Sequence, residues 1–165
     1  MIGRRLRDLG TGLRRWPGLY GWRRTAFELA WVLPLMLVVA HLGGLVRYGE
    51  LPEASTAAAL AASLFVAPAL GEELLFRGLI IPQSGDGGRW IAISTLLFVL
   101  WHPLQAVTFG PPWAQAFLDP WFLAVVALLG LALGQIYAAT GSLWPCIATH
   151  WLTVLGWKTL FGGPF

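Results

Sequence analysis

Residues 56–81 read TAAALAASLFVAPALGEELLFRGLII, a long apolar run that contains two carboxylates and one arginine. A helix needs about 20 apolar residues to cross a bilayer, so this length predicts a membrane-spanning helix. Each charged residue at the centre of such a helix costs roughly 2.5–3.5 kcal/mol on insertion scales. Glu72, Glu73 and Arg77 therefore need partners, and the run predicts a membrane helix with a polar site beside it.

The composition of the whole chain also indicates a membrane protein. Of its 165 residues, 57% are hydrophobic and 12% are charged, whereas soluble domains contain about 25% charged residues. These values argue against an ordinary soluble globule, a disordered chain and a nucleic-acid-binding domain. We therefore expect the lipid bilayer as a partner and no nucleic acid.

Further apolar segments predict an all-α, polytopic bundle of about five transmembrane helices. The expected spans are residues 26–46, 56–81, 90–108, 121–139 and 144–161. The Gly-rich segment between the second and third spans predicts a turn. We expect a basic N-terminal flank over residues 1–25 and a transmembrane domain over residues 26–161. Gly130 and Gly134 form a small-xxx-small pair, which we expect to serve helix packing within the chain.

The charge distribution predicts the orientation in the membrane. The first 28 residues carry nine of the 19 charged side chains, seven of them Arg against Asp8 and Glu28. Because cytoplasmic loops are enriched in Lys and Arg, we place the N-terminus in the cytoplasm. The loops at 47–55 and 109–120 then lie outside. Lys158, near the outer end of the last span, contradicts this weakly, although a long side chain can snorkel.

The basic flank allows two interpretations. The spacing of Leu6, Leu9, Leu13 and Trp16 is compatible with a short amphipathic helix at the membrane interface. A simpler interpretation is a basic juxtamembrane flank that sets topology. We favour the simpler one.

Helical geometry separates the two glutamates of the second span. Glu73 and Arg77 are four residues apart, about 40° on the helix surface, so they are expected to pair. Glu72 lies on a different face and is left to serve another purpose. At about 1.5 Å per residue, Glu72, His102 and His150 lie about 10–18 Å from the inner loops, which lets them converge.

One carboxylate and two histidines inside a membrane suit peptide hydrolysis. The carboxylate serves as general base toward water, and a histidine and a further donor assist. The same three residues are alternatively ligands of a catalytic Zn²⁺. The simplest structural interpretation is an ion pair that locks the helix, with histidines that satisfy backbone carbonyls. Five ionisable groups at compatible depth favour function over that interpretation.

Three motifs now make a family resemblance specific. Residues 72–77 read EELLFR, residues 98–102 read FVLWH, and residues 142–150 read SLWPCIATH. Together they resemble the CPBP family, also called ABI, which contains type II CAAX prenyl proteases and bacteriocin-processing or self-immunity proteins. The resemblance covers a protease-like core at about residues 55–161. It implies a glutamic-type intramembrane endopeptidase, formerly classed as a metalloprotease.

The resemblance also implies residue roles. Glu72 is the catalytic base with His102 beside it, and His150 contributes to the oxyanion site. Glu73, Arg77 and Phe98 are supporting residues, and no cofactor is expected. In this sequence Val154 stands where the family often has an Asn that helps the oxyanion site, which leaves other conceivable donors: Gln105, Ser142 and Thr153.

The resemblance leaves the substrate open. It implies a membrane-associated or anchored protein, with C-terminal sorting signals and leader peptides as candidates, in a bacterial inner membrane. The alternatives are a non-catalytic immunity or scaffold protein and a zinc-dependent form of the same protease.

Overall fold

A computed structural model of the protein describes residues 2–48, 51–84 and 87–163. Its α-helices are α1 (Ile2–Arg14), α2 (Gly18–Leu42), α3 (Ala54–Leu64), α4 (Gly87–Thr108), α5 (Pro120–Thr140) and α6 (Trp144–Leu160). Two π-helical segments, η1 (Phe65–Glu72) and η2 (Leu74–Leu79), continue α3, and a 3₁₀ helix, η3 (Pro112–Leu118), precedes α5. No strand occurs in the described residues, and the all-α prediction is confirmed.

Four helices are long and apolar enough to cross a membrane: α2, the continuous helix Ala54–Leu79, α4 and α5. The fifth expected span is α6, which has 17 residues. At 1.5 Å per residue it is about 26 Å long, somewhat less than the hydrocarbon core of about 30 Å. The prediction of about five membrane helices is therefore roughly right, with four long helices and one shorter one.

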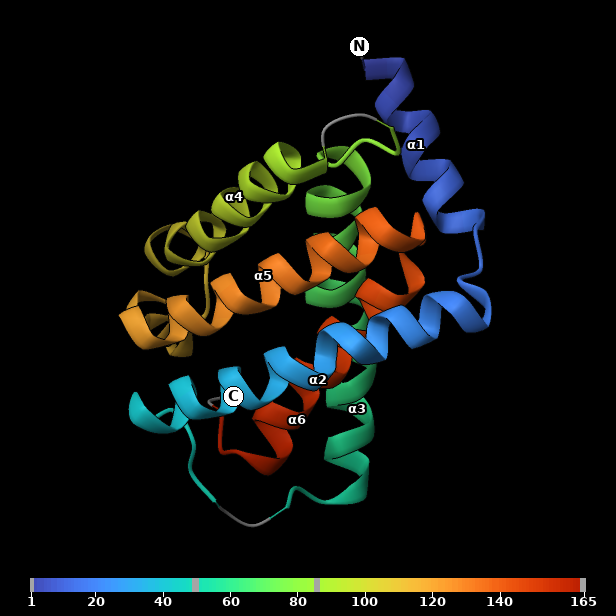
Figure 1. Cartoon of the computed structure of the whole chain (residues 1–165). Helices are drawn as coiled ribbons and strands as arrows, with labels where there is room; N and C mark the ends of the chain where they lie inside the picture. Colours follow the sequence, from blue (N-terminus) through green and yellow to red (C-terminus); the bar gives the residue numbers. More distant parts are fainter. Residues whose placement is uncertain (1, 49–50, 85–86, 164–165) are drawn as a thin grey trace.

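Helix α5 lies between α2 and α4 (Figure 1). Its glycines allow the approach of α4, because a Cβ on Gly130 would lie 3.1 Å from Thr95 and 3.2 Å from Phe98. A Cβ on Gly134 would lie 2.8 Å from Ile91, which is closer than real Cβ contacts. The small-residue pair thus packs α5 against α4 within the chain, as predicted.

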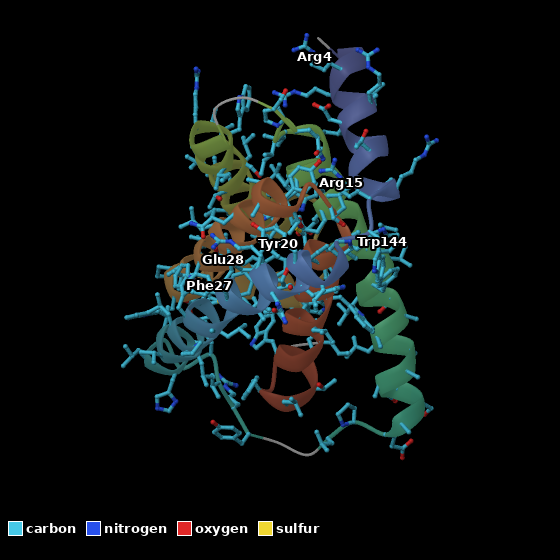
Figure 2. The ribbon with its side chains drawn as sticks, turned by 45° about the vertical axis from the view of Figure 1, so that its right-hand side comes forward. Arg4, Arg15, Tyr20, Phe27, Glu28 and Trp144 are labelled. Atoms are coloured by element: carbon cyan, nitrogen blue, oxygen red, sulfur yellow. The ribbon has the colours of Figure 1, made fainter. Side chains whose placement is uncertain are left out.

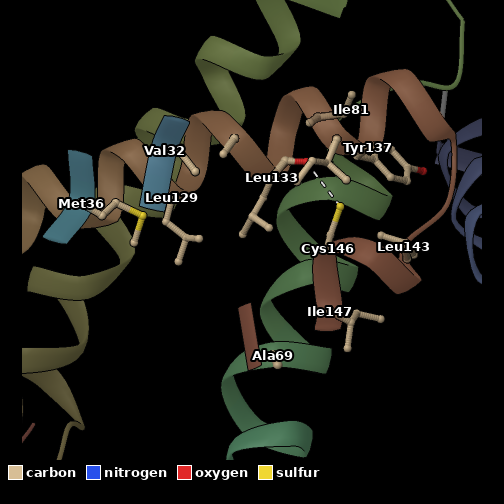
Figure 3. Packing of buried hydrophobic residues seen from close by; sticks show 12 residues of the cluster. Val32, Met36, Ala69, Ile81, Leu129, Leu133, Tyr137, Leu143, Cys146 and Ile147 are labelled. Carbon is tan, nitrogen blue, oxygen red and sulfur yellow. Dashed lines mark hydrogen bonds between the residues drawn. The ribbon is translucent and has the colours of Figure 1, made fainter. Parts of the chain in front are cut away.

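The main hydrophobic core lies where α5 meets α2, α6 and the continuous helix. Figure 3 shows Val32 and Met36 of α2 beside Leu129 of α5, and Cys146 of α6 below Leu133. The thiol of Cys146 donates a weak hydrogen bond to the carbonyl oxygen of Leu133 at 3.4 Å. This packing fixes α6, the helix that carries His150, against the centre of the bundle.

The helix ends that were predicted to face the cytoplasm lie together. Three hydrogen bonds join them: Leu143 N–H to Gly12 O (3.0 Å), Ser142 Oγ–H to Arg15 O (2.6 Å) and Gln83 Nε2–H to Gly141 O (3.0 Å). Arg15 and Trp144 are labelled at this end in Figure 2, with Arg4 at the far end of α1. At the opposite end, Arg47 N–H donates to Phe161 O at 2.9 Å.

The basic N-terminal region is helical. Residues 2–14 form helix α1, in line with the helical spacing of Leu6, Leu9 and Leu13, and α2 begins at Gly18, before the expected first span. Leu9 and Leu13 of α1 pack against the main core. Gly12 brings α1 close to the side chain of Tyr137, whose hydroxyl would lie 3.0 Å from a Cβ there. A short helix is marginal alone, so this packing is what stabilises α1.

Candidate functional site

A cavity of about 650 Å³ is lined by residues of the continuous helix, α4 and α6, and also of α2, η3 and α5. Glu72 at the end of η1, His102 of α4 and His150 of α6 all line it. Most of the remaining wall is apolar or aromatic and includes Met36, Leu64, Trp113, Phe117, Phe122 and Leu129. The depths of these three residues along their helices predicted that they converge. In the structure they line one apolar cavity.

The helix that carries the carboxylates is wider than an α-helix. Pro68 lies inside η1, and Glu72 is the last residue of that π-helical segment. Because Pro has no N–H, it removes one hydrogen bond of the regular ladder. π-Helical turns are rare and frequently occur at functional sites. The irregular backbone thus surrounds the two glutamates.

Glu73 is the centre of a buried ionic network behind the cavity. Its Oε1 accepts hydrogen bonds from Arg77 Nη1 and from His150 Nδ1, each at 2.9 Å. The side chains of Glu73 and Arg77 are 0% exposed. Arg77 also donates from Nη2 to the carbonyl oxygen of Gly130 at 3.2 Å. The expected Glu73–Arg77 pair is present, and it additionally orients His150.

Phe98 packs among these polar groups. The guanidinium carbon of Arg77 lies 4.4 Å from the centre of its ring, a cation–π contact. The ring centroids of His102 and His150 lie 5.0 Å and 5.6 Å from that of Phe98, both edge-to-face. Phe98 therefore contacts both histidines and the arginine, which fits the supporting role that was expected of it.

Glu72 has different partners from Glu73. Its Oε1 accepts a hydrogen bond from Trp101 Nε1 at 3.0 Å. Its Oε2 is buried, and no described residue donates a hydrogen bond to it. This oxygen lies 3.9 Å from His150 Nε2. That distance is too long for a direct hydrogen bond.

The hydrogen bonds assign the protons of both histidines. A carboxylate oxygen only accepts, so Nδ1 of His150 carries the proton that it donates to Glu73. His102 donates from Nδ1 to the carbonyl oxygen of Phe98 at 2.8 Å. In each neutral ring Nε2 is then an acceptor. The simple interpretation, a histidine that satisfies a backbone carbonyl, describes one contact of His102 but none of His150.

Comparison with protein families shows which family the chain belongs to. The model of a family described as type II CAAX prenyl endopeptidase Rce1-like matches residues 53–156. The chain belongs to the Rce1-like family. This confirms the CPBP resemblance, since that family includes the type II CAAX prenyl proteases. No curated protein and no solved structure matches the chain.

Family membership and the helices together give a coarse function. The Rce1-like family is one of CAAX-type intramembrane proteases. With four helices suited to crossing a membrane, this Rce1-like chain is an integral membrane protein. Its surroundings are the lipid bilayer, and its substrates are membrane proteins. The matched range contains Glu72, His102 and His150.

A zinc site needs at least three converging protein donors. Across residues 2–48, 51–84 and 87–163, no three His, Cys, Asp or Glu side chains are close enough together to hold a metal ion. In this Rce1-like structure His150 donates from Nδ1 to Glu73, which leaves Nε2 as its remaining nitrogen. Glu72, His102 and His150 line one cavity but do not form such a group of three donors in the described residues.

The position that departs from the family pattern faces the cavity. Val154 lines it, as do Gln105 and Thr153. Thr153 donates its hydroxyl proton to the carbonyl oxygen of Thr149 at 2.8 Å. Ser142 binds Arg15 at the inner end and does not line the cavity. Of the three conceivable donors, Gln105 and Thr153 therefore line the cavity of this Rce1-like chain, and Ser142 does not.

Two residues that line the cavity were not predicted from the sequence. Trp101 precedes His102 in the second motif, but nothing in the spacing predicts its hydrogen bond to Glu72. Lys158 lies two helical turns after His150 and lines the same cavity, with Nζ 4.0 Å from the centre of the Trp113 ring. It is buried rather than snorkelled outward. The i, i+8 spacing from His150 was the available signal.

Proposed function

We propose that the protein is an endopeptidase that hydrolyses a peptide bond of a membrane-associated or anchored protein, with Glu72 as the general base. One observation carries this proposal. Glu72 Oε2 is buried, accepts no hydrogen bond from the described residues and lies 3.9 Å from His150 Nε2. Both atoms are acceptors, so a water between them donates one proton to each and presents its lone pair to a substrate carbonyl.

The reaction then follows in two steps. Glu72 takes a proton from water while the water oxygen forms a bond to the carbonyl carbon of the substrate. The proton passes to the amide nitrogen as the C–N bond breaks, which leaves one new carboxyl group and one new amine. Glu73, itself bound by Arg77, holds His150, and in this proposal the side-chain amide of Gln105, which lines the cavity, donates to the oxyanion.

The proposed reaction uses no metal ion. Support comes from the geometry, because no three His, Cys, Asp or Glu side chains of the described residues lie close enough together to hold a metal ion. Elemental analysis of the purified active protein tests this point. An activity that needs stoichiometric zinc and is abolished by a chelator would overturn it.

The proposed substrate segment is apolar. The cavity wall is mainly apolar, and a chain segment needs an extended conformation to expose its peptide bonds to Glu72. Anchored C-terminal sorting signals and leader peptides satisfy this requirement. We place the enzyme in a bacterial inner membrane with its N-terminus inside, in line with the basic residues of α1.

Comparison of protein termini in a strain that lacks this chain tests the function. The strain is complemented with the wild type, with Glu72→Gln, or with Glu53→Gln, a matched change at an exposed glutamate. We expect a membrane protein precursor to accumulate in the deletion strain and with Glu72→Gln only. Restored processing by Glu72→Gln would contradict the mechanism, and unchanged termini in every strain would favour the scaffold alternative.

A further inference from the structure

The hydrogen bond from Trp101 to Glu72 connects α4 to η1 inside the cavity. The indole Nε1–H donates to Oε1 at 3.0 Å, within the normal range for such bonds. Both Trp101 and Glu72 line the cavity. A carboxylate that rotates freely would present either oxygen to the cavity. The bond to Oε1 leaves Oε2 as the oxygen that lies nearest to His150.

The indole itself is held in place by two rings. The ring of Phe76 lies 6.4 Å from that of Trp101 and the ring of Phe109 lies 5.7 Å from it, centroid to centroid. Phe76 belongs to η2, which follows η1 in the same continuous helix, and Phe109 directly follows α4, so rings from both sides of the bond support the indole. Its N–H direction is therefore fixed before any substrate arrives.

The type of donor also distinguishes the two glutamates. Glu73 is bound by the cationic Arg77, which neutralises its charge. The donor to Glu72 is a neutral indole, which has no charge to cancel that of the carboxylate. A neutral donor can orient a base without forming an ion pair with it. This difference suits a carboxylate that must accept a proton during the reaction.

We propose that Trp101 is a positioning residue for catalysis: its indole N–H holds Oε1 of Glu72 so that Oε2 faces the water site beside His150. The proposal rests on the proposed function. It adds the indole of Trp101, which is a variable position of the second family motif, to the groups of the proposed site. It also gives the sequence position before His102 a specific chemical requirement, an aromatic N–H donor.

The test uses full-length protein in proteoliposomes and, as probe, the purified precursor that accumulates in the deletion strain. Trp101→Phe keeps an aromatic ring and removes the N–H. The matched control is Trp144→Phe, which removes an indole hydrogen bond of 2.9 Å to Leu13 O at the inner end of the bundle. We expect Trp101→Phe to lower kcat about 10- to 100-fold with KM within about twofold, as for loss of a hydrogen bond to a charged group. Trp144→Phe should leave both constants within about twofold.

A double variant separates positioning from a structural role. In the Glu72→Gln background the oriented base is absent, so Trp101→Phe should lower the residual rate less than twofold. A Trp101→Phe enzyme that matches Trp144→Phe, or that changes KM alone, would overturn the inference while leaving the proposed function intact. If Glu72→Gln cleaves like the wild type, the proposed function fails first, and this inference with it.

A second variant covers the case in which Trp101→Phe does not fold. Benzothienylalanine at position 101 replaces the N–H by sulfur and keeps the size of the bicyclic ring. We expect the same loss of kcat, with an unchanged thermal unfolding midpoint. Wild-type kcat in this isosteric protein would contradict the inference.

Discussion

At the scale of single residues, two adjacent glutamates have opposite surroundings. Glu73 shares one oxygen with Arg77 and His150 and is fully buried. Glu72 has a neutral donor on one oxygen, and its other oxygen is buried without a donor from the described residues. The first arrangement stabilises a charge, and the second suits the general base proposed above. The different roles proposed for them follow from their neighbours, since the two side chains are chemically identical.

The buried ion pair makes Arg77 important for stability. Arg77→Met leaves the carboxylate of Glu73 buried with its cationic partner removed, so we expect a loss of about 3–5 kcal/mol in unfolding free energy. Thermal or denaturant unfolding in detergent measures it. The comparison variant is Arg24→Met, because Arg24 is 40% exposed and its partner Glu28, 4% exposed, keeps a hydrogen bond from Trp31 Nε1, so the loss should be smaller than for Arg77→Met. Equal losses in the two variants would contradict the prediction.

Gln105 is expected to supply the oxyanion donor that Val154 does not. Loss of one such donor typically costs about 100- to 1,000-fold in kcat, so we expect a fall of that order for Gln105→Leu. Gln115→Leu, a matched change outside the cavity, should leave kcat unchanged. Steady-state cleavage of the precursor in proteoliposomes measures both.

A second change at the same site checks this assignment. Because Val154 lines the cavity, Val154→Asn places an amide there. We expect it to recover at least about tenfold of the rate lost in Gln105→Leu. If Gln105→Leu cleaves the precursor as fast as the wild type, another group is the oxyanion donor.

At the scale of elements, most helices followed from the sequence because their ends carry strong local signals. Helix α5 was expected at 121–139 and is found at Pro120–Thr140. Asp119 accepts hydrogen bonds from the backbone N–H groups of Trp121 and Phe122 as N-cap. Gly141 ends the helix with a φ of 62°, a conformation that glycine adopts readily.

Elements that depend on tertiary packing were not predictable in the same way. Helix α1 is stabilised by contacts of Leu9 and Leu13 with residues far along the chain, which no local pattern contains. The hydrogen bond between Trp101 and Glu72 was not predictable either, because it joins residues that are far apart in the sequence. Helical rise predicted the depths of Glu72, His102 and His150, but the rotation of each helix and the π-helical turns decide which neighbours they contact.

The contact between α4 and α5 gives a prediction at this scale. Gly134→Ala would place a Cβ 2.8 Å from Ile91, whereas a Cβ on Gly156 meets nothing within 4 Å. Alanine favours a helix over glycine, so Gly156→Ala should be neutral or stabilising by up to about 1 kcal/mol. We expect Gly134→Ala to be about 1–3 kcal/mol less stable than Gly156→Ala in detergent unfolding. Equal stability would mean that α4 moves away without cost.

At the scale of the whole molecule, the helix ends lie in two groups at opposite ends of the bundle. Gly12, Gln83 and Ser142 share one end, and Arg47 and Phe161 share the other. This matches the expected alternation of loops. The apolar cavity is lined by helices that come from different parts of the chain, which is why one sequence segment alone does not reveal it.

The orientation is testable with single cysteines. Cys146 is fully buried, so it should remain unmodified by a membrane-impermeant maleimide. We expect Leu51→Cys to react in intact spheroplasts and Ser84→Cys only after lysis, because both positions are exposed at opposite ends. The reverse pattern would place the N-terminus outside.

The most direct test of the central claim is the single-turnover rate at which the protein in proteoliposomes cleaves the precursor, measured for the wild type and for Glu72→Gln. Glutamine keeps the size of the side chain and the acceptor for Trp101 but cannot take a proton from water. Loss of general base catalysis lowers the reaction rate about 100- to 10,000-fold. We predict a fall of at least about 100-fold for Glu72→Gln. A rate within twofold of the wild type would contradict the account.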